Sequence, residues 1–158
     1  MKKVNTVRVK MWGTTVGYLH QEDNGLVGFQ YDDEFLKSNI EISPVTMPLS
    51  NVTYSFRSLP EQTFYGLPGM VADSLPDRFG NIVINRYLES QGREPDSLSV
   101  IERLCYTGKR GMGALEYEPS QEIGAIDEPV DLDALTKLAS EILSEKENFH
   151  IEENNQLM

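Results

Sequence analysis

The sequence predicts an α+β fold in which a small antiparallel β-sheet, or partial barrel, is followed by a helical subdomain. Near the N-terminus, the apolar residues Val7, Val9 and Met11 alternate with Arg8 and Lys10, which is typical of a half-buried strand. The segment Asp23-Asn24-Gly25 is a strong hairpin signal, because Asn and Gly tolerate positive φ. After Pro76 the apolar residues recur at helical spacing instead.

The first third is expected to supply four or five strands. The alternation starts again at Val16, and after the hairpin signal one face of the run that ends at Tyr31 is apolar. Asp32 is placed to cap a single helical turn. The further expected elements are that turn over 32–37, an edge strand or extended segment over 40–45, and a short strand over 52–56.

Three helices are expected in the remainder. The first begins at Pro76 and ends before Gly92, a C′ residue. Ser99 and Glu102 form a capping box for the second, which should end near Gly108. The other expectations are burial of Ile101, Leu104 and Cys105 on the second helix, an extended segment over 111–117, and a last helix over 131–146 that is capped by Asp131. The predicted division is strand-rich over 1–60, mainly helical over 61–146, and an acidic tail over 147–158.

Composition narrows the class of protein. The chain has 158 residues, of which 39% are hydrophobic, and no apolar run approaches the roughly 20 residues that span a bilayer. The N-terminus lacks the apolar core of a signal peptide, and the single cysteine, Cys105, excludes an internal disulfide. We therefore expect a cytoplasmic protein without membrane contact.

The net charge of −11 is uneven along the chain. Residues 111–158 hold two basic and twelve acidic residues, whereas residues 1–110 are nearly neutral. Such an acidic third repels phosphate backbones, so no direct nucleic-acid binding is expected. It is either a solvated face or a surface that meets a basic partner.

The polar segment Gly66 to Gly80, GLPGMVADSLPDRFG, is the strongest candidate for chemistry. Asp73, Ser74, Asp77 and Arg78 precede a helical pattern, where such residues satisfy free N–H groups and favour the helix dipole. We expect them to form a polar network that fixes this helix, after a tight connection at Gly66 and Gly69. The alternatives are a carboxylate pair for acid–base work or Mg²⁺ binding, or a small metal-dependent hydrolase that also uses Asp32.

The other candidates favour structural roles. Gly108 to Gly113, with Lys109 and Arg110, lacks the order of a phosphate loop and precedes a strand, so it is a glycine-rich turn or an anion or partner contact. His20 and His150 have no neighbouring ligand pattern and are expected at exposed or edge positions. The residues themselves therefore indicate neither a catalytic nor a metal site.

Two long motifs resemble the N-terminal region of the HipA family of serine/threonine kinases, the toxins of bacterial type II toxin–antitoxin modules. The first is G-L-P-G-x-x-A-D-S-L-P-D, from Gly66 to Asp77. The second is G-x-R-G-M-G-A-L-x-Y-x-P, from Gly108 to Pro119. G-x-x-V-G-x-L at Gly13 and F-x-Y at Phe29 fit the same region, and the resemblance covers roughly residues 5–145. The residues that carry it most specifically are Gly66, Pro68, Gly69, Asp73, Ser74, Pro76, Asp77, Arg110, Gly111 and Gly113.

The resemblance implies a regulatory and interaction domain that contacts the HipA-like kinase core and a HipB-like DNA-binding antitoxin. It implies no catalytic, cofactor-binding or metal-binding residue in this chain, because the glycine-rich ATP loop, the catalytic aspartate and the Mg²⁺-holding residues of such kinases are absent from it. ATP and Mg²⁺ would belong to the full-length kinase. The alternative is a free-standing small protein that neutralises a separately encoded HipA-like kinase.

Overall fold

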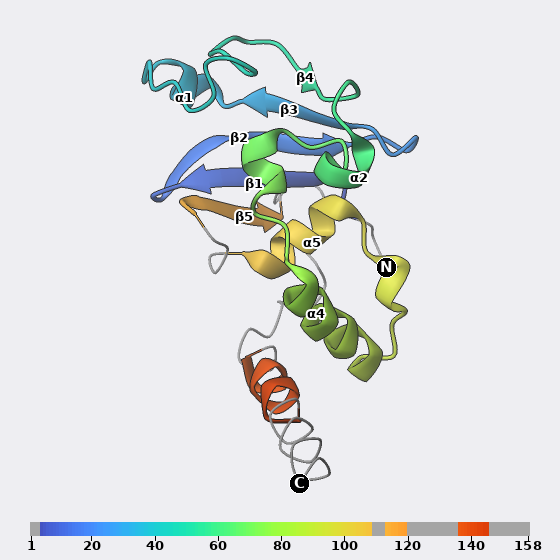
Figure 1. Cartoon of the computed structure of the whole chain (residues 1–158). Coiled ribbons are helices and arrows are strands. Elements are labelled where there is room, and N and C mark those ends of the chain that lie inside the picture. Colours follow the sequence, from blue (N-terminus) through green and yellow to red (C-terminus); the bar gives the residue numbers. More distant parts are fainter. Residues whose placement is uncertain (1–3, 109–112, 120–135, 146–158) are drawn as a thin grey trace, which may run out of the picture. The chain divides into compact units, whose positions relative to one another are not determined.

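The computed structural model describes residues 4–108, 113–119 and 136–145 (Figure 1). These residues form two compact units. The first comprises the described residues up to 76 and from 99 to 119, and the second comprises 77–98 and 136–145. Among the described residues, no helix is long and apolar enough to cross a bilayer.

The first unit is built on an open antiparallel sheet in the order β4-β3-β2-β1-β5 (Figure 1). The predicted α+β class is therefore confirmed, and the helices follow the first strands as expected. The last described strand, β5, pairs with β1, so that Val9 lies opposite Tyr117. The described strands are β1 (Thr6–Met11), β2 (Thr14–Gln21), β3 (Val27–Tyr31), β4 (Tyr54–Ser55) and β5 (Leu115–Pro119).

Alternation along the strands gives the sheet one apolar and one polar face. Val9, Leu19 and Phe29 are fully buried in the core cluster. On the polar face, Lys10 pairs with Glu118 at 3.1 Å. Short helices of the same unit contribute to the core, and Figure 1 shows α2 and α5 on one side of the sheet. The helices that contribute are α1 (Asp33–Leu36), α3 (Gly69–Ala72) and α5 (Val100–Thr107), whereas α2 (Glu61–Phe64) has no buried residue.

Local capping signals in this unit are confirmed. The Asp32 carboxylate accepts hydrogen bonds from the backbone of Glu34 and Phe35 and begins α1. Ser99 and Glu102 form the expected capping box of α5, which buries Ile101 together with Leu104 and Cys105 and ends at Gly108.

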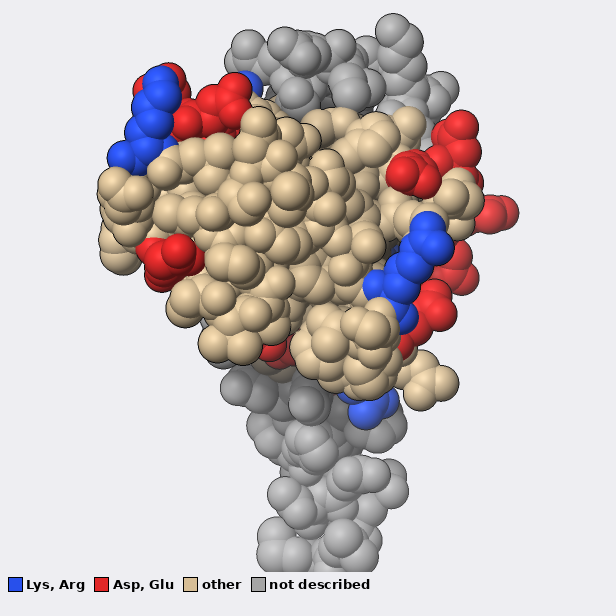
Figure 2. All heavy atoms as spheres, turned by 90° about the horizontal axis from the view of Figure 1, so that it is seen from above, with Lys and Arg blue, Asp and Glu red and all other residues tan. Residues whose placement is uncertain are grey.

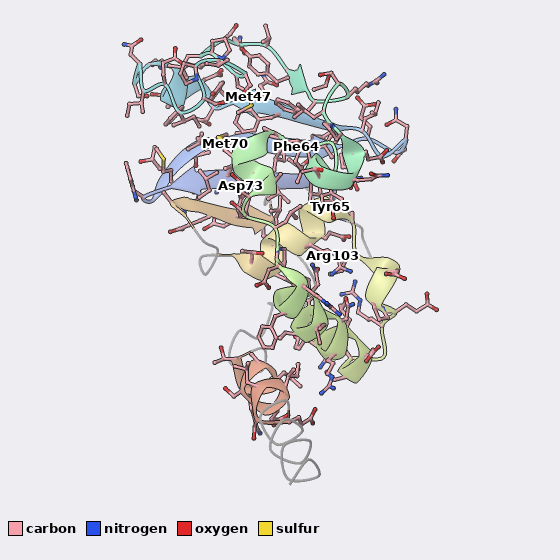
Figure 3. All side chains as sticks on the ribbon, in the orientation of Figure 1. Met47, Phe64, Tyr65, Met70, Asp73 and Arg103 are labelled. Atoms are coloured by element: carbon pink, nitrogen blue, oxygen red, sulfur yellow. The ribbon has the colours of Figure 1, made fainter. Side chains whose placement is uncertain are left out.

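The segment after α1 differs from the prediction. Residues 40–45 form bends and turns rather than an edge strand, and the strand expected over 52–56 is only two residues long. Pro44 and Pro48 cannot donate to a ladder, which disfavours pairing here. The segment is instead held by Met47, which is fully buried and whose carbonyl accepts a 2.6 Å hydrogen bond from the Tyr31 hydroxyl (Figure 3).

The second unit contains α4 (Arg78–Ser90), the 3₁₀ turn η1 (Pro95–Ser97) and a helix over 136–145. Gly92, at φ +71°, follows the C-cap of α4, and Arg93 N–H donates to the Leu88 carbonyl, as in a Schellman ending. Arg86 pairs with Glu145 at 3.1 Å. The last predicted helix is confirmed over 136–145, whereas its cap Asp131 and the acidic tail lie outside the described residues.

The β1–β2 hairpin has an unusual residue at its tip. Trp12 (φ +50°) and Gly13 (φ +79°) are both left-handed, as a two-residue type I′ turn requires. Glycine adopts this conformation freely, but for tryptophan it costs about 1 kcal/mol. The indole is 81% exposed, so packing does not offset this cost.

We expect Trp12→Asn to raise the free energy of unfolding by about 1 kcal/mol, because Asn is favoured at this turn position. Urea denaturation followed by circular dichroism would measure the change. Trp12→Ala is the matched control, since it removes the indole without favouring the left-handed backbone. Equal stabilities for the Asn and Ala variants would contradict the assignment of strain to the backbone.

Candidate functional site

The polar segment Gly66 to Gly80 begins with the sequence GLPG, which connects α2 to α3. Tyr65 (φ +54°) and Gly66 (φ +73°) are consecutive left-handed residues that reverse the chain after α2. Pro68 caps α3, and Gly69 is its first residue. The predicted need for a tight connection is thus met at Gly66, whereas Gly69 has no positive φ, and a Cβ there would meet only Phe64 at 3.6 Å.

Ser74 and Tyr117 bring the two sequence motifs together. Ser74 follows α3 and is 5% exposed, and Tyr117, in β5, is 3% exposed. The Tyr117 hydroxyl donates to Ser74 Oγ at 2.7 Å across a sequence separation of 43 residues. Ser74 Oγ lies 3.5 Å from the Met70 carbonyl, to which it donates. This buried contact ties the first motif to the second inside one core.

The sequence reasoning missed this contact. Ser74 was predicted to belong to a polar network that fixes the following helix, and Tyr117 was predicted to end an extended segment and to belong to the second motif. The available signal was the strand alternation, which places Tyr117 on the same face as the buried residues of β1. Nothing in the sequence pattern indicated that Ser74 is its partner.

The acidic residues of the segment have separate roles. Asp73 is the C-cap of α3 and is exposed (Figure 3). Asp77 is the N-cap of α4, where its carboxylate accepts from Gly80 N–H at 2.7 Å. Arg78 is the first residue of α4 and is exposed, so the helix begins two residues later than predicted.

The contacts described do not join Asp73, Ser74, Asp77 and Arg78 into the predicted polar network. Instead, Ser74 forms its hydrogen bonds within the core, and Asp77 caps a helix. Pro76 lies between these two environments in the sequence.

We expect Asp77→Ala to lower the free energy of unfolding by about 1 kcal/mol, because the Gly80 N–H loses its acceptor. Asp73→Ala is the matched control and should have little effect, since the exposed Asp73 does not cap α4. Thermal denaturation followed by circular dichroism compares the stabilities of the two variants. A larger loss at Asp73 would show that the cap is not what stabilises this segment.

The structure describes only part of the second motif, Gly108 to Pro119. Gly108 is the C-cap of α5, and its carbonyl accepts from Tyr117 N–H at 3.4 Å. Gly113 (φ +110°) precedes β5. Lys109, Arg110 and Gly111 lie outside the described residues, so the glycine-rich turn stays a prediction.

The remaining candidates have structural partners or are buried. His20 is exposed, as expected, and its Nδ1 lies 2.8 Å from Thr6 Oγ1. Burial raises the pKa of the Cys105 thiol to about 12, and the Glu102 charge adds to this effect, so this cysteine is the buried apolar residue that was predicted. His150 lies outside the described residues. Across the described part of the chain, no three His, Cys, Asp or Glu residues lie together as a metal site requires.

The burial of Tyr117 affects stability at alkaline pH. Burial raises the pKa of Tyr117 from 10.0 to about 12; the hydrogen bond with Ser74 opposes this rise, and the charge of Asp73 adds to it. A raised pKa in the folded state means that stability is complete below pH 10 and falls as the pH rises toward 12.

We expect Tyr117 to contribute about 2 kcal/mol to the loss of stability between pH 10 and 12. Tyr117→Phe should lower stability at pH 7, because Ser74 loses a partner, but should flatten the alkaline decline. Urea midpoints measured from pH 8 to 12 test this. Tyr65→Phe, which alters an exposed tyrosine, is the control, and an identical flattening in both variants would contradict the assignment.

A comparison with protein-family models identifies the fold family. The model of the HipA N-terminal domain matches residues 7–118. This range includes every described strand except Thr6 of β1 and Pro119 of β5, the whole of the first motif, and the second motif up to Glu118. No curated protein matches the chain. Because the match spans most of the sequence, the chain belongs to the HipA N-terminal domain family.

Proposed function

We propose that the chain is the regulatory and interaction domain of a HipA-like serine/threonine kinase of a toxin–antitoxin module. The observation that carries this proposal is the family match over residues 7–118. In this proposal the domain contacts the HipA-like kinase core and a HipB-like DNA-binding antitoxin, and it contributes no chemical step of its own.

The distribution of the signature residues supports an interaction role. Ser74 and Tyr117 join the two motifs in the core of the first unit, and Asp77 begins a helix of the second. A scaffold of this kind holds surfaces in place, whereas phosphoryl transfer needs groups that bind phosphates and metal. The polar groups Ser74 and Asp77 are occupied by structural hydrogen bonds.

In the same proposal, ATP and Mg²⁺ are bound by the kinase core. Calorimetric titration of the purified chain with ATP–Mg²⁺ should therefore give no saturable heat, while the same titration of a full-length HipA-like kinase should. Saturable nucleotide binding by this chain would overturn the assignment as a purely interacting domain.

The antitoxin contact is tested separately. A HipB-like antitoxin should co-elute with the chain and the kinase core in size-exclusion chromatography, and the complex should be larger than that of core and antitoxin alone. A complex whose mass is unchanged by the chain would remove the antitoxin from the proposal.

A further inference from the structure

The tip of the β1–β2 hairpin exposes the only tryptophan of the chain. Trp12 combines a left-handed backbone with an indole that is 81% exposed. Strain that is not offset by packing is characteristic of residues kept for a contact with another molecule. Large exposed aromatic side chains are also the residues that dominate protein interfaces.

A cavity of about 510 Å³ lies beside this tryptophan, within the first unit. We name it the Trp12 groove and define it by six of its lining residues. Four of them are apolar and two are acidic: Met11, Trp12, Phe35, Ile40, Asp32 and Glu34. Figure 2, which views the molecule from the side of α1 and β4, shows a broad uncharged face with charged side chains at its rim. Ile40, one of the lining residues, is 50% exposed, so part of the apolar lining is open to solvent.

The two carboxylates of the groove differ in how readily each can bind a side chain of another protein. Asp32 caps α1 and also accepts from the Tyr18 hydroxyl at 3.4 Å, so it is a fixed part of the fold. The Glu34 carboxylate pairs with Lys37 at 2.6 Å, the single contact given for it among the described residues, and both side chains are more than two-thirds exposed. Such exposed pairs contribute at most about 1 kcal/mol and are readily exchanged for a better partner.

We propose that the Trp12 groove binds an arginine side chain of a partner protein. A guanidinium group stacks on an indole face and binds a carboxylate through two parallel hydrogen bonds, and no other side chain does both. In the groove, the guanidinium lies over Trp12 and pairs with Glu34, displacing Lys37. The methylene stem of the arginine packs on Ile40 and Met11.

This inference deepens the proposed interaction function and rests on it for the existence of a partner. The carboxylates of Asp32 and Glu34 in the groove, with Asp33 beside them in the first turn of α1, favour the approach of a basic partner segment. The groove itself can be tested with peptides, so its failure is distinguishable from a failure of the chain to bind a kinase core or an antitoxin.

The experiment uses the fluorescence of Trp12, which reports on the groove alone because the chain has no other tryptophan. The probe is the peptide acetyl-Ser-Leu-Arg-Leu-Ser-amide, and its control replaces arginine with citrulline, which is isosteric and neutral. We expect a saturable change with the arginine peptide and an affinity at least about fivefold lower for the citrulline peptide. Equal affinities, or no saturable change with the arginine peptide, would overturn the proposal.

Two variants test the ion pair. Glu34→Gln should reduce the affinity for the arginine peptide about fivefold or more, because the guanidinium loses its carboxylate. Lys37→Gln should raise the affinity, because Glu34 is released from its present partner. Arg57→Gln makes the same change in net charge at an exposed residue that does not line the groove, and it should have a smaller effect. If Lys37→Gln and Arg57→Gln raised the affinity for the arginine peptide equally, the gain would be due to net charge alone. That result would contradict the assigned contact with Glu34.

Discussion

Replacing Gly17 with alanine is expected to destabilise the protein by at least about 3 kcal/mol. Gly17 lies in β2 opposite Val9 on one side and Tyr31 on the other, so both neighbouring strands confine it. A Cβ atom at this position would overlap the Gln30 carbonyl oxygen and would lie 2.7 Å from Cζ of Phe29. The carbonyl belongs to the backbone of β3 and cannot move without breaking the sheet.

Gly13→Ala is the matched control for this prediction. A Cβ at Gly13 meets no atom within 4 Å, so only the left-handed backbone opposes the change, at a cost of about 1 kcal/mol. Urea denaturation monitored by circular dichroism should therefore rank the wild type first, Gly13→Ala second and Gly17→Ala last. A Gly17→Ala variant as stable as Gly13→Ala would show that β2 and β3 are not packed as described.

Truncation of Glu102 is expected to lower the free energy of unfolding by about 2–3 kcal/mol. Glu102 is 7% exposed, and its two carboxylate oxygens accept from different segments of the chain. Oε2 accepts from Ser99 N–H at 2.7 Å and completes the capping box of α5. Oε1 accepts from Val4 N–H at 3.2 Å and so fastens the start of β1 to the helix. Glu102→Ala leaves both donors without this acceptor: the Val4 N–H in a buried position and the Ser99 N–H in a partly buried one.

Ser99→Ala separates the two roles of Glu102. It removes the reciprocal half of the capping box but leaves the bond to Val4, and should cost only about 1 kcal/mol. Amide hydrogen exchange gives the second readout: the Val4 amide should exchange faster in Glu102→Ala and should be unchanged in Ser99→Ala. Equal losses of stability, with Val4 protected in both variants, would contradict the proposed fastening of β1.

Local elements could be predicted from the sequence because their causes are local. Asp32 and Ser99 cap helices through bonds that span two or three residues, and the alternation around Val9 follows from the pleat of a single strand. Of the two alternatives for residues 40–45, the edge strand was wrong, because two isoleucines alternating with polar residues resemble a strand locally, whereas Pro44 within the segment cannot donate to a ladder.

Contacts between distant segments could not be predicted in the same way. Tyr117 donates to Ser74 across 43 residues, and Glu102 accepts from Val4 across 98 residues. Propensity and periodicity specify which face of an element is buried, but they do not specify which other element covers it. The capping box correctly predicted one partner of Glu102, whereas its second partner depends on the fold.

The resemblance to the family extended the prediction beyond these limits. It marked Gly66 to Asp77 and Gly108 to Pro119 as related segments, and the structure shows the physical link in the buried bond between Ser74 and Tyr117. It did not indicate the Trp12 groove, which depends on a left-handed, exposed indole beside α1.

The proposed function requires this domain to bind a HipA-like kinase core. The most direct measurement is a calorimetric titration of the chain into a HipA-like kinase core that lacks its own N-terminal domain. The account predicts saturable binding with a stoichiometry of one to one, and no heat when an unrelated serine/threonine kinase takes the place of the core. No binding to the HipA-like core, or equal binding to both kinases, would contradict it.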